Sequence, residues 1–135
     1  MLDNFFEYTR NEINLSENDI NQLSPLVLAY IGDSVFEVFI RTSLIIDTSS
    51  SVHKLHKRSI EFVKAKAQSD RVHRISEFLT LEEQNIVRRG RNAKSGTIPK
   101  NADVTEYKYA TGFESLLGFL YLKKDYKRLL EILKM

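Results

Sequence analysis

The chain has 135 residues, no cysteine and a formal net charge of +2. This length predicts a single domain over residues 1–135. The absence of cysteine excludes disulfides and thiolate metal sites, and it fits a reducing compartment. We find neither an apolar run long enough to cross a membrane nor a secretory leader in residues 1–10, so we expect a cytoplasmic protein. The net charge alone is too small to indicate a nucleic-acid partner.

Apolar residues recur at helical spacing in most segments and sustained alternation is absent, so we predict an all-α fold, a helical bundle. The predicted helices cover about residues 16–22, 25–46, 52–78, 80–90, 104–122 and 125–133. Pro25 suits the first turn of the second helix, and the third is expected to break near Asp70. Thr80 and Glu83 form a capping-box pattern, and Asp103 can cap the helix that follows it.

Two carboxylates stand in strongly apolar surroundings. Asp33 follows Gly32 within residues 23–40, and Glu114 lies between small residues in the apolar segment 112–122. A buried carboxylate is costly unless it is ion-paired, hydrogen-bonded or bound to a metal. For one isolated acid an Arg or Lys partner is the simpler explanation, but two acids beside small residues favour a metal site. Oxygen ligands without cysteine and with few histidines indicate Mg²⁺ or Mn²⁺.

All the charged residues in the segment 84–102 are basic. The five basic residues are Arg88, Arg89, Arg91, Lys94 and Lys100, and the segment contains no acid. Because Gly90, Gly96 and Pro99 interrupt it, we predict an extended basic loop over residues 89–102. Such a run is often only a solvated surface, but beside a carboxylate–metal site it would bind phosphates. Together these features predict metal-assisted hydrolysis of a phosphodiester.

Two other motifs are rejected. Residues 90–97 are similar to a phosphate-binding P-loop, but Ala93 stands where a glycine is required before the lysine. His53 and His56 have the spacing of metal ligands on a helix, yet no third ligand is placed to complete the site, so we interpret them as surface residues.

Three segments resemble the catalytic domain of the ribonuclease III family. They are LAYIGDSVFEVFIR at residues 28–41, HKRSIEFVKAKAQ at 56–68 and RRGRNAKSGTIPKNADVTEYKYATGFESLLGFLYL at 88–122. The chain is most similar to the short form of the family, which lacks a domain for binding double-stranded RNA. The resemblance implies an all-α homodimeric endonuclease that cleaves double-stranded RNA with Mg²⁺ and leaves 5′-phosphate ends. Mn²⁺ is expected to substitute for Mg²⁺.

The resemblance also implies roles for single residues. Asp33 and Glu114 occupy the positions of catalytic metal ligands. Two further carboxylates of the larger enzymes are replaced by Ala29 and Thr111, as is usual in the short form, which leaves open whether one or two metal ions act. Glu37 and Asp103 are possible auxiliary acids, but we interpret them as a surface residue and a helix cap. The five basic residues named above are the candidates for RNA binding.

The short form of the family is associated with maturation of the 23S ribosomal RNA precursor, which is therefore the expected substrate, with a large-subunit ribosomal protein as a potential helper. The main alternative is a catalytically inactive helical RNA-binding module of ribosome assembly. Retention of both Asp33 and Glu114 argues against that alternative. A helix-turn-helix DNA binder is not supported, because no short polar recognition helix follows a tight turn.

Overall fold

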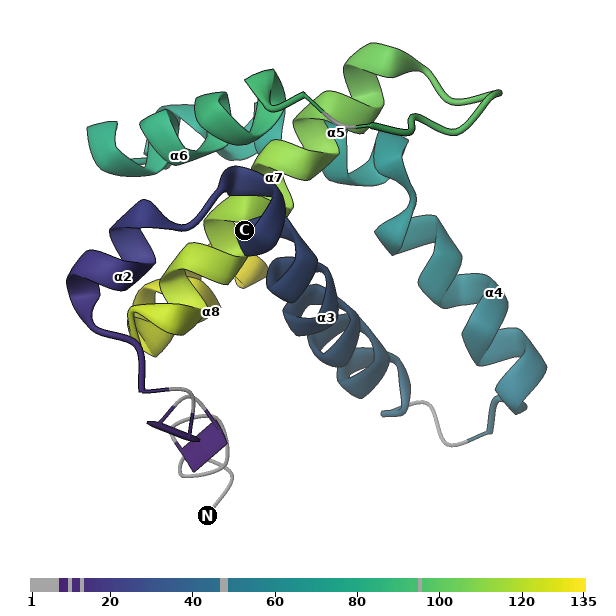
Figure 1. Ribbon diagram of the computed structural model, residues 1–135. Helices are drawn as coiled ribbons and strands as arrows, with labels where there is room; N and C mark the ends of the chain where they lie inside the picture. Colours follow the sequence, from purple (N-terminus) through teal and green to yellow (C-terminus); the bar gives the residue numbers. More distant parts are fainter. Residues whose placement is uncertain (1–7, 10, 13, 47–48, 95) are drawn as a thin grey trace.

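The computed structural model describes residues 8–9, 11–12, 14–46, 49–94 and 96–135, and these contain helices and no strand. The longer elements are α2 (Glu17–Gln22), α3 (Pro25–Leu44), α4 (Val52–Val63), α5 (Ala65–Ile75), α6 (Leu81–Asn92), α7 (Val104–Leu122) and α8 (Tyr126–Lys134), with a 3₁₀ turn η1 (Ser76–Phe78) after α5. Helix α7 runs through the middle and is packed by α3, α5 and α6 (Figure 1). The predicted all-α fold is confirmed.

Most helices begin at a polar side chain that accepts a hydrogen bond from the backbone two or three residues ahead. The Thr80 hydroxyl accepts from the Glu83 N–H at 3.1 Å, and the Glu83 carboxylate accepts from the Thr80 N–H at 2.9 Å, which completes the predicted capping box. Asp103 caps α7 by accepting from the N–H of Glu106 at 3.0 Å. Asp103 is therefore seen in the capping role that its position predicted.

The predicted helix over residues 52–78 is divided at a different place. The break falls at Lys64, which is extended and separates α4 from α5, rather than near Asp70. No glycine or proline marks Lys64, so the break has no strong local signal. The side-chain amide of Gln68, which is buried, donates to the Val63 carbonyl at 2.8 Å and satisfies an acceptor that the break leaves without a helical partner.

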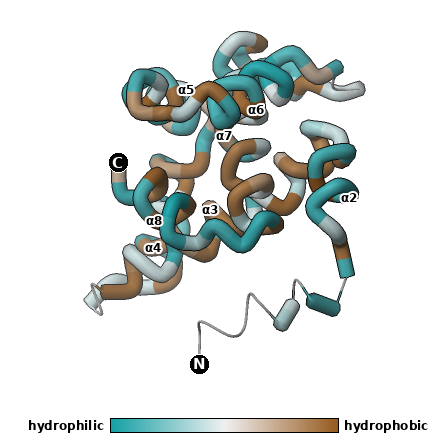
Figure 2. Tube along the Cα trace, turned by 90° about the vertical axis from the view of Figure 1, so that its left-hand side faces the viewer, coloured by the Kyte–Doolittle hydropathy of each residue, from teal (hydrophilic) through white to brown (hydrophobic). Residues whose placement is uncertain are grey.

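The core is built around α7. Phe113, Leu116 and Leu117 on this helix are fully buried, and Phe36 of α3 meets the Phe113 ring edge-on at 5.4 Å between centroids. Figure 2 shows the apolar stretches of α3 and α7 in the middle of the molecule, with hydrophilic segments on α5 and α6. None of the described helices combines the length and apolarity needed to span a bilayer.

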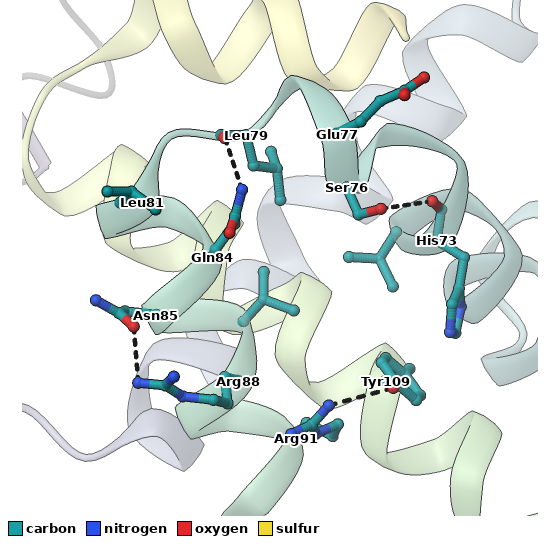
Figure 3. Close-up of a pocket in the computed structure, with 12 residues that line it drawn as sticks. His73, Ser76, Glu77, Leu79, Leu81, Gln84, Asn85, Arg88, Arg91 and Tyr109 are labelled. Carbon is teal, nitrogen blue, oxygen red and sulfur yellow. Dashed lines mark hydrogen bonds between the residues drawn. The ribbon is translucent and has the colours of Figure 1, made fainter.

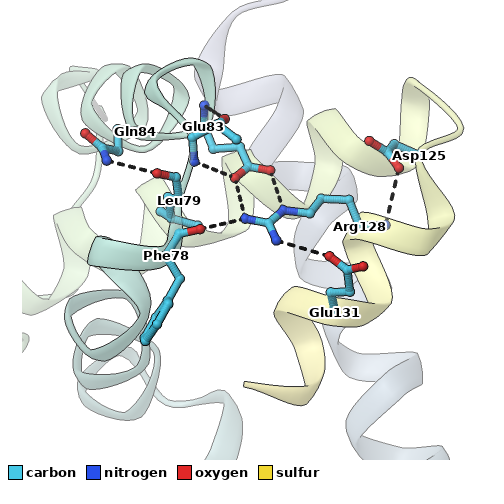
Figure 4. Close-up of polar contacts among 8 residues, drawn as sticks. Phe78, Leu79, Glu83, Gln84, Asp125, Arg128 and Glu131 are labelled. Atoms are coloured by element: carbon cyan, nitrogen blue, oxygen red, sulfur yellow. Dashed lines mark hydrogen bonds and ion pairs between the residues drawn. The ribbon is translucent and has the colours of Figure 1, made fainter.

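A buried ion pair attaches α8 to α6. The Arg128 guanidinium donates to both carboxylate oxygens of Glu83, at 2.9 and 2.8 Å, and also to the Phe78 carbonyl and the Glu131 carboxylate (Figure 4). The Glu83 side chain is only 5% exposed. Its hydrogen bonds to Arg128 hold the pKa of this carboxyl below the ordinary value, despite burial.

We expect Arg128→Met to destabilise the protein by about 3 kcal/mol, because it leaves the Glu83 carboxylate buried without its partner. The loss should be largest above pH 5 and shrink in acid. The lowered pKa of Glu83 means that the pair stabilises the fold only while the carboxylate is ionised. Urea denaturation at several pH values measures the effect, with Glu131→Gln as the control at the exposed end of the network. A loss below 1 kcal/mol at pH 7 would contradict this account.

Candidate active site at the crossing of α3 and α7

Helices α3 and α7 cross with their backbones in contact. A Cβ atom added to Gly32 would meet the carbonyl of Glu114 and the backbone nitrogen of Gly118, and one added to Gly118 would meet the carbonyl of Leu28. Only glycine at both positions permits this approach, because any side chain would strike backbone atoms that cannot rotate away. The crossing places Asp33, the residue after Gly32, beside Glu114.

The two carboxylates face each other at this crossing. Glu114 is half-buried, whereas Asp33 is exposed among the described residues, although both stand in apolar stretches of the sequence. Burial, the Asp33 charge and a hydrogen bond to Asp33 together raise the pKa of Glu114 to about 9. Glu37 adds a smaller repulsion, but its carboxylate is held by Arg41 at 2.9 Å, as expected for a residue on the helix surface.

Ser115, next to Glu114, fixes α7 against the start of α3. Its side chain is fully buried, and its hydroxyl oxygen lies 2.8 Å from the carbonyl oxygens of both Pro25 and Thr111. The same hydroxyl lies 2.6 Å from where a Cβ of Gly90 would be, so α6 also approaches α7 closely here. The sequence indicated only a small residue at position 115. Its hydrogen bond to α3 and its closeness to α6 are visible only in the structure.

The positions of the two absent carboxylates are filled by groups that cannot replace them. Ala29 is buried one turn before Asp33, and the Thr111 hydroxyl donates to the Tyr107 carbonyl at 3.0 Å. Among the described residues no group of three or more His, Cys, Asp or Glu side chains is arranged to hold a metal ion. The site therefore offers two facing carboxylates, with Glu37 close by.

The five predicted RNA-binding residues do not form one loop. Helix α6 continues through Gly90 to Asn92, so Arg88, Arg89 and Arg91 lie on a helix. Gly90 does not end the helix. Its lack of a side chain leaves space for Ser115 of α7. Only the part of the predicted basic loop that follows residue 92 is outside the helix.

The basic side chains also face different hollows. Lys94 lines one with Lys108 and Thr111, which we call the lysine hollow. Thr111, which lines this hollow, precedes Glu114 by about one turn on the same face of α7. The sequence prediction did not include Lys108, because this residue lies outside the basic segment 84–102. The remaining members of the predicted set lie elsewhere: Arg88 and Arg91 line a hollow between α5 and α6, Arg89 lines one beside α2 and α3, and Lys100 is exposed.

Apolar side chains are exposed on α3 beside Asp33. Tyr30 is 81% exposed, Val38 52% and Val27 47%, although this helix supplies much of the core on its other side. Scattered exposed apolar residues are ordinary, but a run along one helix face is typical of a surface that another protein covers.

Facing carboxylates that can hold a metal ion are a feature of enzymes that hydrolyse phosphodiesters with metal assistance. The sequence profile of the Ribonuclease III domain matches residues 26–125. The chain belongs to the ribonuclease III family. Enzymes of this family act on double-stranded RNA as dimers and use a divalent metal ion, and this protein is an endoribonuclease of that class.

The relatives are of similar length. Proteins named Mini-ribonuclease 3 from Thermoanaerobacter sp. (strain X514) and Clostridium tetani are each 50% identical over 121 residues, which cover 90% and 89% of this chain and 85% and 80% of theirs. The Mini-ribonuclease 3 of Staphylococcus aureus is 42% identical over 118 residues, covering 86% of this chain and 88% of its own. The crystal structure of a Fusobacterium nucleatum protein superposes with a TM-score of 0.76 at 34% identity, covering 86% of this chain and 93% of that one.

Replacing Gly32 by alanine should destabilise the fold by about 3 kcal/mol or more, since the new methyl group meets backbone atoms of α7. Gly96→Ala is the matched control, because nothing lies within 4 Å of a Cβ atom there. Urea denaturation followed by circular dichroism measures both variants. Equal stability of the two would show that α3 and α7 do not depend on close backbone contact.

Glu114→Gln should stabilise the metal-free protein at pH 8 but not at pH 4. Because folding raises the pKa of Glu114 to about 9, the unfolded chain ionises first, and wild-type stability falls as pH rises between 4.5 and about 9. Glutamine does not titrate and escapes this loss. We expect a Tm about 5 °C higher than wild type at pH 8 in EDTA, measured by thermal denaturation. Glu61→Gln, at an exposed position, should show no such pH-dependent gain.

Proposed function

We propose that Asp33 and Glu114 are the catalytic residues and hold Mg²⁺ between them. The observation that carries this proposal is the placement of Asp33 beside the partly buried Glu114 at the close crossing of α3 and α7, and the raised pKa of Glu114 agrees with it. A divalent cation relieves that repulsion and favours the ionised form of both acids. The residues present fit Mg²⁺, which binds through one or two carboxylates and keeps several waters. Mn²⁺ takes the same oxygen ligands and is expected to substitute.

The chain's own contribution to the reaction is position and charge. The close crossing at Gly32 fixes the backbone of Glu114, and the Arg41 ion pair keeps Glu37 engaged outside the pair. Bound Mg²⁺ supplies Lewis acidity and a lowered pKa for water. In the proposed reaction water adds to the phosphorus and the bond from phosphorus to the 3′ oxygen breaks. A proton passes to that oxygen, leaving a 5′-phosphate and a 3′-hydroxyl.

We propose that the lysine hollow contacts the backbone of the duplex next to the bond that is cut. Lys94 and Lys108 line it, and Lys100 lies farther along the same segment. Double-stranded RNA is recognised through its A-form shape, its phosphates and its 2′-hydroxyls, for which flexible lysines are suited. The arginines of α6, Arg88, Arg89 and Arg91, are proposed to contact RNA farther from the cleaved bond.

The second subunit of the dimer is proposed to cover the exposed apolar face of α3. In the proposed dimer the two carboxylate pairs would lie on either side of one duplex, so that each subunit would cut one strand. Tyr30→Glu should then sediment as a monomer in analytical ultracentrifugation, and an intact dimer would place the interface elsewhere.

We propose the 23S ribosomal RNA precursor as the natural substrate, a cytoplasmic location, and a large-subunit ribosomal protein as a helper. The proposal rests on the resemblance to the short form of the family and on the similarity to proteins named Mini-ribonuclease 3. Cuts in a transcript of the precursor stem should fall at the mature ends, with their rate increased by the ribosomal protein. Uniform cutting along the stem would exclude this substrate.

Asp33→Asn and Glu114→Gln should each lower the rate of duplex RNA cleavage in Mg²⁺ at least about 1,000-fold while leaving binding in EDTA within a few-fold of wild type. Asp103→Asn and Glu37→Gln are the matched controls, since they make the same chemical changes at a helix cap and a surface ion pair. Both controls should cleave within a few-fold of wild type. Near-normal cleavage by Asp33→Asn would exclude the assignment, and binding without cleavage by the wild type would favour an inactive RNA-binding module.

A further inference from the structure

A second hollow lies between α5 and α6, away from the carboxylate pair. Val72, Leu79 and Val87 are among the apolar residues that line it, and Figure 3 shows polar side chains around it. Tyr109 of α7 borders it. Tyr109 and Glu114 are five residues apart, which is about 140° around a helix of 3.6 residues per turn, so they lie on different sides of α7. We call this the α5–α6 hollow.

Two guanidinium groups border the α5–α6 hollow without a carboxylate partner. Arg88 donates to the Asn85 amide oxygen at 2.7 Å, and Arg91 donates to the Tyr109 hydroxyl at 3.2 Å and lies over its ring at 5.4 Å. Within the described residues neither is ion-paired, in contrast to Arg41 and Arg128. Neutral partners hold both arginines in place and leave their charge for a ligand, which is the condition expected of an anion-binding site.

The remaining polar groups present both hydrogen-bond donors and acceptors. The Gln84 amide nitrogen donates to the Leu79 carbonyl, which leaves its amide oxygen for a ligand, whereas the Asn85 oxygen accepts from Arg88 and leaves its amide nitrogen. His73 Nδ1 lies 2.7 Å from the Ser69 carbonyl oxygen, so Nδ1 carries the hydrogen and Nε2 remains available. Amides that read base edges, arginines for phosphate and an apolar lining are the groups that bind an unpaired nucleotide.

The last turn of α6 separates this hollow from the lysine hollow. Arg91 lines the α5–α6 hollow, while its neighbours Gly90 and Asn92 line the lysine hollow. A strand leaving the carboxylates would cross one helix, about 10–12 Å wide, to reach the arginines. An unpaired strand is flexible enough to pass around this turn of helix.

We propose that the α5–α6 hollow binds an unpaired nucleotide of the RNA strand that flanks the cleaved duplex, with its phosphate on Arg88 and Arg91 and its base against the apolar lining. The proposal rests on RNA being the ligand of the adjoining site, but not on which residues cut it. Glu77 on the opposite rim can accept a hydrogen bond from an exocyclic amino group of the base.

The test compares binding of one duplex with blunt ends and the same duplex with single-stranded extensions of a few nucleotides. Binding is measured in EDTA by fluorescence anisotropy over a range of salt concentrations. The wild type should bind the extended duplex roughly tenfold more tightly. In the double variant Arg88→Gln, Arg91→Gln this preference should fall to about one. The log–log slope of affinity against salt should become shallower by about 0.7 for each phosphate that the variant no longer neutralises.

The control removes the same charge elsewhere. Arg74→Gln with Lys127→Gln changes two exposed residues outside both hollows, and it should retain the tenfold preference. Equal binding of blunt and extended duplexes by the wild type would overturn the proposal, as would a preference that survives in the double variant. Either result leaves the cleavage proposal intact as long as the blunt duplex is bound and cut in Mg²⁺. Failure to bind or cut the blunt duplex would instead overturn the proposed function.

Discussion

The backbone contact between α3 and α7 determines much of this structure. Gly32 and Gly118 allow two of its most apolar helices to touch, and α5, α6 and α8 also pack against α7. The contact has two consequences that do not depend on each other. It closes the core through residues such as Phe36 and Phe113, and it places Asp33 beside Glu114. The same two helices therefore carry both the core of the protein and its candidate chemistry.

The electrostatics of the molecule follow a simple contrast. Where a buried acid serves the fold, as Glu83 does, it receives a bidentate arginine and its pKa falls. Glu114 instead faces a second acid, Asp33, and its pKa rises. A chain under selection for stability alone has little reason to keep such a pair, so unfavourable charge at a close helix crossing is itself evidence of function. The two carboxyls are physically comparable and differ in their partners.

The sequence predicted the helices where local signals are strong, as at the Thr80–Glu83 capping box. The prediction failed where contacts between distant helices determine the local structure. The break at Lys64 has no glycine or proline, and Gly90 was interpreted as a helix end although it serves a helix crossing. The carboxylates were identified by residue type and by resemblance. Their proximity could not follow from periodicity, because it depends on which positions of two distant helices meet.

The hydrogen bond between Ser115 and Pro25 joins residues 90 positions apart in the chain. Contacts of such long range form late in folding, since the loop between them must close first. During synthesis α3 leaves the ribosome before α7, so Asp33 and Glu114 cannot meet until residue 114 has been made and has emerged. The proposed metal site would therefore be absent from the nascent chain up to that point.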